Sequence, residues 1–363
     1  MNKTRLRRDV RWVVQRIILV LALPATVAGC AMSVPVRPAG TSGSLPDAIR
    51  AVARPAHSLQ LGAGRDHRRT FVASVSAAGG RVSRGLAVFS SADGYLIRRL
   101  TRDRLFPAAA AASPDGRWVY FFRESDLAPR SCQGSGFTEP SLWKVPARGG
   151  RPQRAGLRTT SLAFSPDGRM AAYTTARRCG LTIWIVVRDR KAGTTRRILL
   201  ARNAPTSNNP TETAQLSWAP DDRHLAIAVA PAAAINSLYV LNARTATKLP
   251  ATTIAPCNAP NDDCLDPSYD HRGRLTFLKW RNQLGHHPER VVRWQHDHAS
   301  RLFTLSRSQS AERTASIAVD PANGAVLIEG GLRQRQIWRW SGGSITLIRT
   351  SSRRQLVTGV LWL

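Results

Sequence analysis

The segment Leu162–Tyr173, LAFSPDGRMAAY, places a proline, an aspartate and a glycine between two short runs of alternating apolar residues. Such alternation is typical of half-buried strands. Between the runs, Pro166 presets φ for the second position of a turn, Asp167 can accept bonds from nearby backbone N–H groups, and Gly168 can take the left-handed conformation. The segment therefore predicts a β-hairpin, in which Asp167 shapes the turn and does no chemistry.

The same turn pattern recurs along the chain. Its five copies are Ser113–Arg117, Ser165–Arg169, Ala219–Arg223, Asp270–Arg274 and Asp320–Gly324. The positions that align with the turn glycine are 116, 168, 222, 273 and 324, and they are separated by 52, 54, 51 and 51 residues. A repeat of this length is typical of β-propeller blades. Five equivalent turns cannot all be active sites, so the recurrence favours a structural role. The residues assigned to it are Asp115, Gly116, Asp167, Gly168, Asp221, Gly273 and Gly324.

Each repeat divides into four short strands, and the number of repeats predicts the size of the ring. Five units begin near Ala108, Thr159, Thr213, Leu265 and Arg313. A first unit, starting at Thr70, lacks an inner strand, whereas the terminal run Leu356–Leu363 has the inner-strand pattern and no unit behind it. We therefore predict an all-β fold over residues 70–363: a six-bladed β-propeller of four-stranded antiparallel blades, with the ring closed by the C-terminal strand.

The turn SPDGR followed by an apolar strand, in repeats of this length, resembles the WD-type propeller repeat of the TolB family. It is also similar to the propeller domains of prolyl oligopeptidase-type peptidases. The resemblance spans residues 70–363 and implies the fold, whereas functions differ widely among propellers. TolB carries an α/β domain ahead of its propeller and docks a peptidoglycan-associated lipoprotein. Here a leader and a tether precede the propeller, so that docking role does not transfer directly.

The N-terminus has the layout of an export signal. Residues 1–16 carry six basic side chains and one acidic side chain, and the apolar run Ile17–Ala28 follows. This run is shorter than the roughly 20 residues that span a bilayer as a helix. It ends in Val27-Ala28-Gly29-Cys30, which resembles a bacterial lipobox. We expect a signal peptide over residues 1–29 and lipidation of Cys30; the alternative is an ordinary cleaved signal with an incidental cysteine.

Composition bears on the tether and on the partners of the chain. Residues 30–69 are rich in Pro, Gly, Ser and Ala and predict a flexible tether. The formal charge of the chain is +30, and only five of its 53 basic residues are lysine. An arginine-rich, lysine-poor composition is typical of a GC-rich genome, whereas the alternative is an anionic partner. Since the basic residues form no block, we expect no nucleic-acid partner.

The cysteines other than Cys30 number four, which in an exported chain favours two disulfides. Cys132 and Cys179 fall in the same loop of adjacent blades, between strands two and three. Cys257 and Cys264 flank one short loop between blades four and five. We therefore predict the pairs Cys132–Cys179 and Cys257–Cys264 on one face of the ring, the alternative being free buried thiols.

The sequence contains no pattern specific for catalysis or metal binding. No G-x-S-x-G or nucleotide-binding glycine motif occurs in a suitable context. His286 and His287 are expected in a loop on one side of a strand, and His296 and His298 in the turn on the other side, too far apart for one zinc ion. A further group, Asp262, Asp263 and Asp266, fits no calcium loop of the EF-hand kind and is expected in a solvated loop.

These observations predict a lipid-anchored, extracytoplasmic binding protein without a cofactor or a metal. Its loops or axial funnel would recognise an envelope protein, a peptide or a cell-wall component, because binding residues tend to lie on loops held by a rigid scaffold. We expect a monomer. Two alternatives stay open: an enzyme, either a lyase or a hydrolase, acting on a glycan or peptide in the funnel, and a TolB-like envelope assembly factor.

Overall fold

The computed structural model describes thirteen stretches of the chain. They are residues 69–77, 83–102, 108–123, 140–177, 182–202, 215–229, 237–250, 253–257, 262–281, 290–305, 316–330, 336–350 and 355–363. The chain separates into two units, Met1–Ser44 and Leu45–Leu363, and all described residues belong to the second. The predicted signal peptide, Cys30 and the tether up to residue 68 lie outside the described residues.

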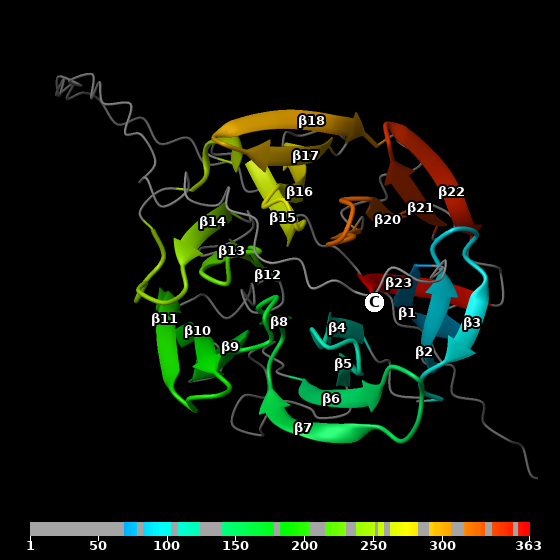
Figure 1. Cartoon of the computed structure of the whole chain (residues 1–363), viewed down its shortest axis with the longest axis horizontal. Coiled ribbons are helices and arrows are strands. Elements are labelled where there is room, and N and C mark those ends of the chain that lie inside the picture. The colour runs from blue at the N-terminus through cyan, green and yellow to red at the C-terminus, as the bar shows by residue number, and fades with distance from the viewer. Residues whose placement is uncertain are drawn as a thin grey trace, which may run out of the picture. The chain divides into compact units, whose positions relative to one another are not determined.

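Six antiparallel sheets form the blades of a ring (Figure 1). Blade 1 contains β23 (Gln355–Trp362), β1 (Thr70–Ala77), β2 (Ser83–Ser90) and β3 (Leu96–Arg99). Blade 2 contains β4 (Ala108–Ala112), β5 (Trp118–Arg123), β6 (Ser141–Pro146) and β7 (Gln153–Arg158). Blade 3 contains β8 (Leu162–Phe164), β9 (Met170–Arg177), β10 (Thr182–Asp189) and β11 (Thr195–Arg202).

The remaining three blades complete the ring. Blade 4 contains β12 (Gln215–Trp218), β13 (His224–Val229) and β14 (Ser237–Asn242). Blade 5 contains β15 (Asp262–Tyr269), β16 (Leu275–Arg281), β17 (Arg290–Gln295) and β18 (His298–Thr304). Blade 6 contains β19 (Ser316–Val319), β20 (Val326–Gly330), β21 (Gln336–Ser341) and β22 (Ser344–Thr350). A three-residue 3-10 helix, η4 (Ala255–Cys257), precedes blade 5.

The hydrophobic core lies between blades. Because successive side chains of a strand point to opposite faces, each blade packs one apolar face on either neighbour. Six clusters of buried side chains result, and each joins two adjacent blades. In the cluster between blades 1 and 2, for example, Val72 and Val88 pack against Val119 and Phe121, and all four are fully buried. The alternating apolar side chains of the strands thus form the interfaces between blades all the way around the ring.

The C-terminal strand completes blade 1, which confirms the predicted closure of the ring. β23 pairs with β1 from Phe71–Trp362 to Ala77–Gln355, as the innermost strand of the blade. Trp362 is buried, and its Nε1 donates to the carbonyl oxygen of Ala318 in blade 6 at 2.8 Å. The last strand therefore supplies both the inner edge of blade 1 and a contact to blade 6.

Blade 4 departs from the predicted four strands. Within the described residues it has three, because the chain after β14 lies against blade 3. Lys248 forms a parallel bridge with Leu199 of β11, and Leu199 N donates to the carbonyl oxygen of Thr247 at 3.0 Å. The segment Ala243–Pro250 contains no run of alternating apolar residues that could form a regular outer strand.

The turn of the opening segment has the geometry that its residues predict. Gly168 N donates to Ser165 O at 2.8 Å, and Gly168 has a φ of +69°. The Asp167 carboxylate accepts from Ser165 Oγ at 2.5 Å and from Arg169 N at 2.9 Å. In the third copy of the turn, which belongs to blade 4, Asp222 occupies the glycine position with a φ of +55°, which aspartate tolerates better than most residues.

Replacing Asp167 by alanine should lower the free energy of unfolding by about 1 kcal/mol, because two local hydrogen bonds at a half-exposed turn are lost. Equilibrium urea denaturation of both proteins measures the difference. Asp115→Ala is the matched control, since Asp115 accepts the same two bonds from Ser113 Oγ and Arg117 N. A loss above about 3 kcal/mol in either variant would mean that the carboxylate does more than shape a turn.

Candidate functional site

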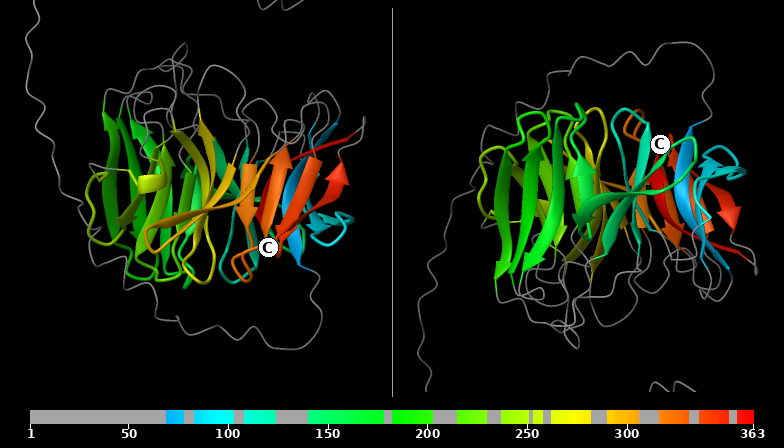
Figure 2. Two further views of the ribbon diagram at one scale, coloured as in Figure 1. Left: turned by 90° about the horizontal axis from the view of Figure 1, so that it is seen from above. Right: turned by 90° about the horizontal axis from the view of Figure 1, so that it is seen from below.

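The propeller has two unlike faces (Figure 2). The connections between first and second strands, and between third and fourth strands, are short turns that the structure describes; we call this side the turn face. The remaining connections join strand ends at the opposite side, which we call the loop face. Within residues 70–363, every stretch outside the described residues is a connection of the loop face or adjoins one.

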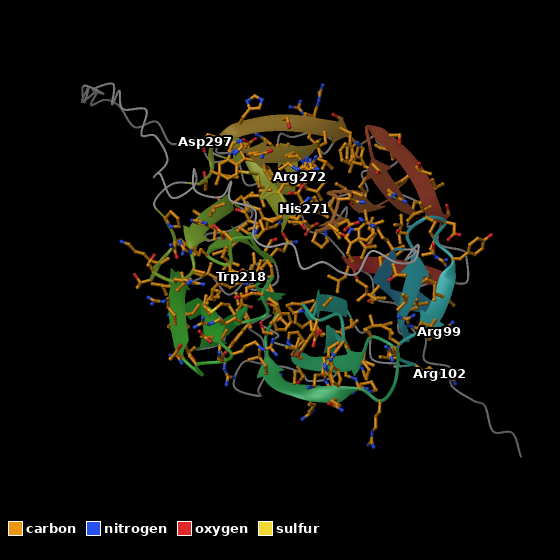
Figure 3. All side chains as sticks on the ribbon, in the orientation of Figure 1. Arg99, Arg102, Trp218, His271, Arg272 and Asp297 are labelled. Carbon is orange, nitrogen blue, oxygen red and sulfur yellow. A yellow bond between two sulfur atoms is a disulfide. The ribbon has the colours of Figure 1, made fainter. Side chains whose placement is uncertain are left out.

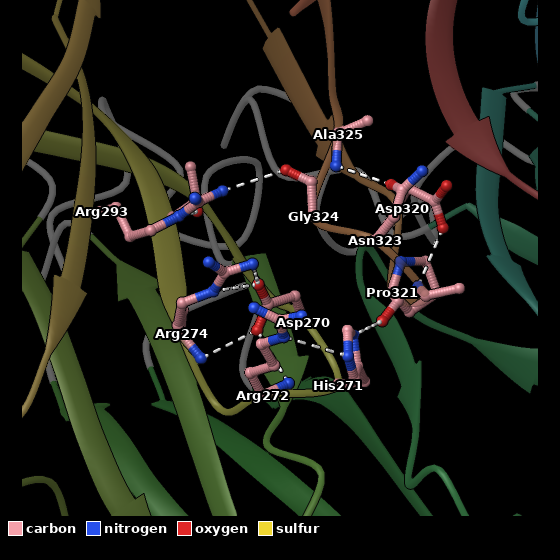
Figure 4. A network of polar contacts seen from close by, with 12 residues as sticks. Asp270, His271, Arg272, Arg274, Arg293, Asp320, Pro321, Asn323, Gly324 and Ala325 are labelled. Carbon is pink, nitrogen blue, oxygen red and sulfur yellow. Dashed lines mark hydrogen bonds and ion pairs between the residues drawn. The ribbon is translucent and has the colours of Figure 1, made fainter. Parts of the chain in front are cut away.

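On the turn face, carboxylates brace the turns from within, and backbone and ionic contacts join neighbouring blades (Figure 4). The buried Asp270 accepts from Arg274 Nε at 2.6 Å and from the backbone N–H of Arg272 at 3.0 Å. His271 N donates to Pro321 O of blade 6 at 2.8 Å. Asp320, also buried, forms an ion pair with Arg69. These carboxylates are engaged in the protein itself, as expected of structural turns.

One of the predicted turn glycines, Gly324, lies in a crowded part of this arrangement. Gly324 has a φ of +72°, and a Cβ atom at that position would lie 2.8 Å from both Asp270 Oδ2 and Arg274 Nη2. Its carbonyl oxygen accepts from Arg293 Nη2 at 3.0 Å. His271 and Arg272 lie close to the ring axis, whereas Arg99 lies at the outer edge of the ring (Figure 3). The turn face thus presents an interlocked set of turns around the axis.

Polar side chains link the inner strands of blades 4, 5 and 6 around the axis. Ser217 Oγ accepts from Tyr269 N at 3.0 Å, and Ser268 Oγ accepts from Val319 N at 3.4 Å. One level nearer the loop face, Asp266 N donates to Gln215 Oε1 at 2.6 Å. Inner strands would otherwise expose unpaired backbone N–H groups, so polar side chains of the preceding blade satisfy them.

Asp266 is the centre of this arrangement. Its carboxylate accepts from Ile317 N of blade 6 at 3.0 Å and from Gln215 Nε2 of blade 4. It lies at an irregularity of β15 with a φ of +51°. Burial, opposed by the bond from the Ile317 N–H and assisted by the negative charge of Glu329, raises the pKa of Asp266 to about 7. Asp266 therefore changes its protonation near neutral pH.

Glu329 adds a second carboxyl group to the same region. It is 4% exposed and lies in β20, where Ser316 Oγ contacts its Oε2 at 3.3 Å. We call Gln215, Asp266, Ser316 and Glu329 the axial cluster. Gln215 and Ser316 begin the inner strands β12 and β19. Because inner strands start at the loop face, the axial cluster lies towards that end of the ring.

A hydroxyl cluster occupies the corresponding position in blade 3. Thr174 Oγ1 contacts Thr159 Oγ1, Thr160 Oγ1 and Ser161 Oγ, each at 3.1 Å. Ser161 and Thr174 extend the register of β8 and β9 by one pair, which is the place that Ser316 and Glu329 occupy in blade 6. Blades 3 and 6 are opposite in the ring, so buried polar groups occupy equivalent positions near the loop-face ends of two opposite blades.

The prediction of a solvated loop for Asp262, Asp263 and Asp266 is wrong. These residues belong to β15, and Asp262 and Asp263 are 4% and 5% exposed. Asp262 is paired with Lys279 at 2.8 Å. The error arises because DDCLDPSY lacks apolar alternation, whereas an inner strand carries polar groups toward the axis. The signal that was missed is the repeat length: Asp266 lies 51 residues after Gln215 and 51 residues before Ile317.

A disulfide joins Cys257 and Cys264, both buried between blades 4 and 5. Cys264 lies within β15 rather than beside a loop, so the bond attaches η4 to the inner strand of blade 5. Cys132 and Cys179 lie outside the described residues, and their pairing stays a prediction.

The histidines lie where the strand pattern places them, as far as the structure describes them. His296 is in the turn between β17 and β18 with a φ of +48°, and His298 begins β18; both are exposed. His286 and His287 lie outside the described residues. In the described part of the chain, no three His, Cys, Asp or Glu side chains gather as metal ligands would. Nor does that part contain a helix long and apolar enough to cross a membrane.

Comparison with known proteins identifies similar folds among solved structures. No family model matches the sequence, and no curated protein matches it. Among solved structures, the chain is similar to TolB from Acinetobacter baumannii, with 12% identity, a TM-score of 0.60 and coverage of 82% of this chain and 67% of that one. A putative TolB from Agrobacterium tumefaciens has 12% identity, a TM-score of 0.50 and coverage of 81% and 98%. The chain is therefore a six-bladed β-propeller with the fold of the TolB propellers.

Proposed function

We propose that this chain is an extracytoplasmic binding protein, anchored to the cell membrane through a lipidated Cys30, which recognises an envelope protein, a peptide or a cell-wall component at its loop face. The leader and the lipobox-like tetrapeptide support the location. The TolB-like fold supports a role in recognition, since propellers present loops on a rigid ring.

The observation that carries the proposal is the difference between the two faces. The carboxylates of the turn face, including Asp167 and Asp270, have their partners inside the propeller. The loop face has the longer connections, such as residues 124–139 and 203–214, and the axial cluster lies towards that end of the ring. Long connections carried by a rigid scaffold are a usual arrangement for binding.

The axial cluster suits a ligand with neutral polar groups. Near pH 7 Asp266 is partly protonated, so it can donate as well as accept. Ser316 adds a half-buried hydroxyl group beside Glu329. Peptide amides and sugar hydroxyls offer complementary donors and acceptors.

One observation favours the alternative of an enzyme. Asp266, with a pKa near 7, and the buried Glu329 form a carboxyl pair of the kind that general acid–base catalysis of glycan cleavage uses. However, both oxygens of Asp266 accept bonds within the propeller, as do Ser217 Oγ and Ser268 Oγ in the same series, so a ligand would contact the loops and Ser316 rather than Asp266 itself. Binding is therefore the better-supported function, and a TolB-like assembly role would be one form of it.

Site-specific photo-crosslinking in cells tests the proposal. A benzophenone amino acid replaces Ser135, in the loop-face connection 124–139, or Lys191, an exposed residue of the turn face. We expect one dominant protein or cell-wall adduct from position 135 and none from position 191, identified by mass spectrometry. The same adduct obtained from position 191 alone would overturn the assignment of the loop face. Turnover of purified cell-wall glycan by the protein would instead support the enzyme.

A further inference from the structure

A pocket of 460 Å³ lies between blades 3 and 4 at the turn face, away from the axial cluster. Its floor is apolar and is formed by Met170, Val187 and Ala243, all buried. Its rim carries the guanidinium groups of Arg169, Arg196 and Arg244. The pocket therefore combines an apolar base with three cationic side chains.

The irregular end of blade 4 explains why a pocket forms here. After β14 the chain leaves its own blade and runs beside β11, where Lys248 bridges to Leu199. Arg244 stands at the start of this crossing segment, and Arg196 stands at the start of β11. The start of β11 and the start of the crossing segment thus both line the pocket between blades 3 and 4.

Charge in the pocket is unbalanced. Arg169 donates to Asp189 Oδ2 from Nε at 2.9 Å and lies 2.8 Å from it through Nη2. Asp189 also accepts from the backbone N–H groups of Lys191 and Ala192, at 3.0 and 2.9 Å. These bonds hold the pKa of Asp189 below its ordinary value, so this carboxylate stays ionised and neutralises Arg169.

The two other arginines have no such partner. Within the described part of the chain, neither Arg196 nor Arg244 has a side-chain hydrogen bond or an ion pair, and both are exposed. Thr194 and Thr195 contribute hydroxyl groups to the same wall. Guanidinium groups bind carboxylates and phosphates through paired N–H donors, so a rim of this composition matches an acidic group.

We propose that this pocket binds a small organic anion, whose acidic group contacts Arg196 and Arg244 and whose apolar stem lies against Met170 at the apolar base of the pocket. The site is independent of the loop face and adds a second ligand to the function proposed above. A carboxylate or a phosphate satisfies the rim equally in charge, and the stem distinguishes such a ligand from an inorganic ion.

Isothermal titration calorimetry of the purified propeller with hexyl phosphate, inorganic phosphate, hexanoate and hexanol tests this proposal. We expect hexyl phosphate or hexanoate to bind at least about tenfold more tightly than inorganic phosphate and hexanol. Raising the salt concentration to about 0.5 M should weaken binding of the acidic probes, because exposed charges are screened. Equal binding of hexanol, or no binding of either acidic probe, would overturn the proposal.

Variants assign the binding to the pocket. Arg196→Ala and Arg244→Ala should each weaken binding of the acidic probe by about tenfold. Arg301→Ala is the matched control, since Arg301 is an exposed outer-strand arginine of blade 5 and its loss should change nothing. Thermal melting of each variant verifies folding. Unchanged affinity in both pocket variants would contradict the site, whatever the wild-type affinity.

Discussion

Deletion of residues 356–363 is expected to abolish the folded propeller. β23 is the inner strand of blade 1, and its removal leaves β1 with an unpaired edge along its length. It also removes the buried Trp362 and its bond to Ala318 of blade 6. Loss of one large buried aromatic side chain alone costs about 3 to 5 kcal/mol, and whole domains are stable by about 5 to 15 kcal/mol.

Circular dichroism melting of the deleted and intact proteins measures this effect. We expect the deleted protein to lack a cooperative thermal transition. Leu363→Ala is the control for changes at the terminus, because Leu363 is 37% exposed and its loss should leave the melting temperature nearly unchanged. A deleted protein that melts cooperatively at the temperature of the intact one would contradict closure of the ring by β23.

The second large effect is the pH dependence that Asp266 gives to stability. Its pKa is about 7 in the folded protein and 3.8 as the ordinary value, so between these pH values the folded state binds a proton that the unfolded state has released. The contribution of Asp266 to the free energy of unfolding is therefore fully present below about pH 4 and is lost as the pH rises to about 7. The shift corresponds to about 4 kcal/mol at most.

Asp266→Asn isolates this contribution. In acid both oxygens of the protonated carboxyl group can still accept from Gln215 and Ile317. An asparagine amide nitrogen in the place of one oxygen cannot accept, so the variant is less stable than the wild type in acid. Urea denaturation from pH 4 to pH 8 measures both proteins. We expect the difference between them to shrink by up to about 4 kcal/mol as the pH rises.

Asp115→Asn is the matched control for this titration. Hydrogen bonds from Ser113 and from Arg117 N lower the pKa of Asp115, so its contribution is present above the ordinary value and is lost only as the pH falls. The difference between wild type and Asp115→Asn should therefore be flat from pH 5 to pH 8. Parallel stability curves of wild type and Asp266→Asn over the same range would mean that Asp266 does not titrate in the folded state there.

The sequence predicted those parts of the fold that repeat. The spacing of the turns at Asp115 and Asp167 predicted the number of blades, because a turn with Pro, Asp and Gly has few other uses between apolar strands. The run Leu356–Leu363 predicted the closure, because an inner-strand pattern without a following blade must pair with one that lacks it. Local chemistry and repeat length sufficed in both cases.

The parts that sequence patterns missed depend on contacts between blades. Asp266 was expected in solvent because its strand lacks alternation, yet the strand borders the axis, where Gln215 and the Ile317 N–H meet the carboxyl group. The pocket at Arg196 and Arg244 arises from the crossing of blade 4 towards blade 3, which no local pattern encodes. In contrast, the lack of alternation after β14 could have predicted that residues 243–250 form no regular outer strand of blade 4.

The central claim is that binding belongs to the loop face and that the turn carboxylates are structural. It is tested most directly by the affinity of the partner captured from position 135 for two folded variants, Asp167→Ala on the turn face and Ser316→Arg in the axial cluster. We expect Asp167→Ala to bind within about twofold of the wild type and Ser316→Arg to bind at least about tenfold more weakly. Loss of binding in a fully folded Asp167→Ala protein, with binding kept in Ser316→Arg, would contradict the account.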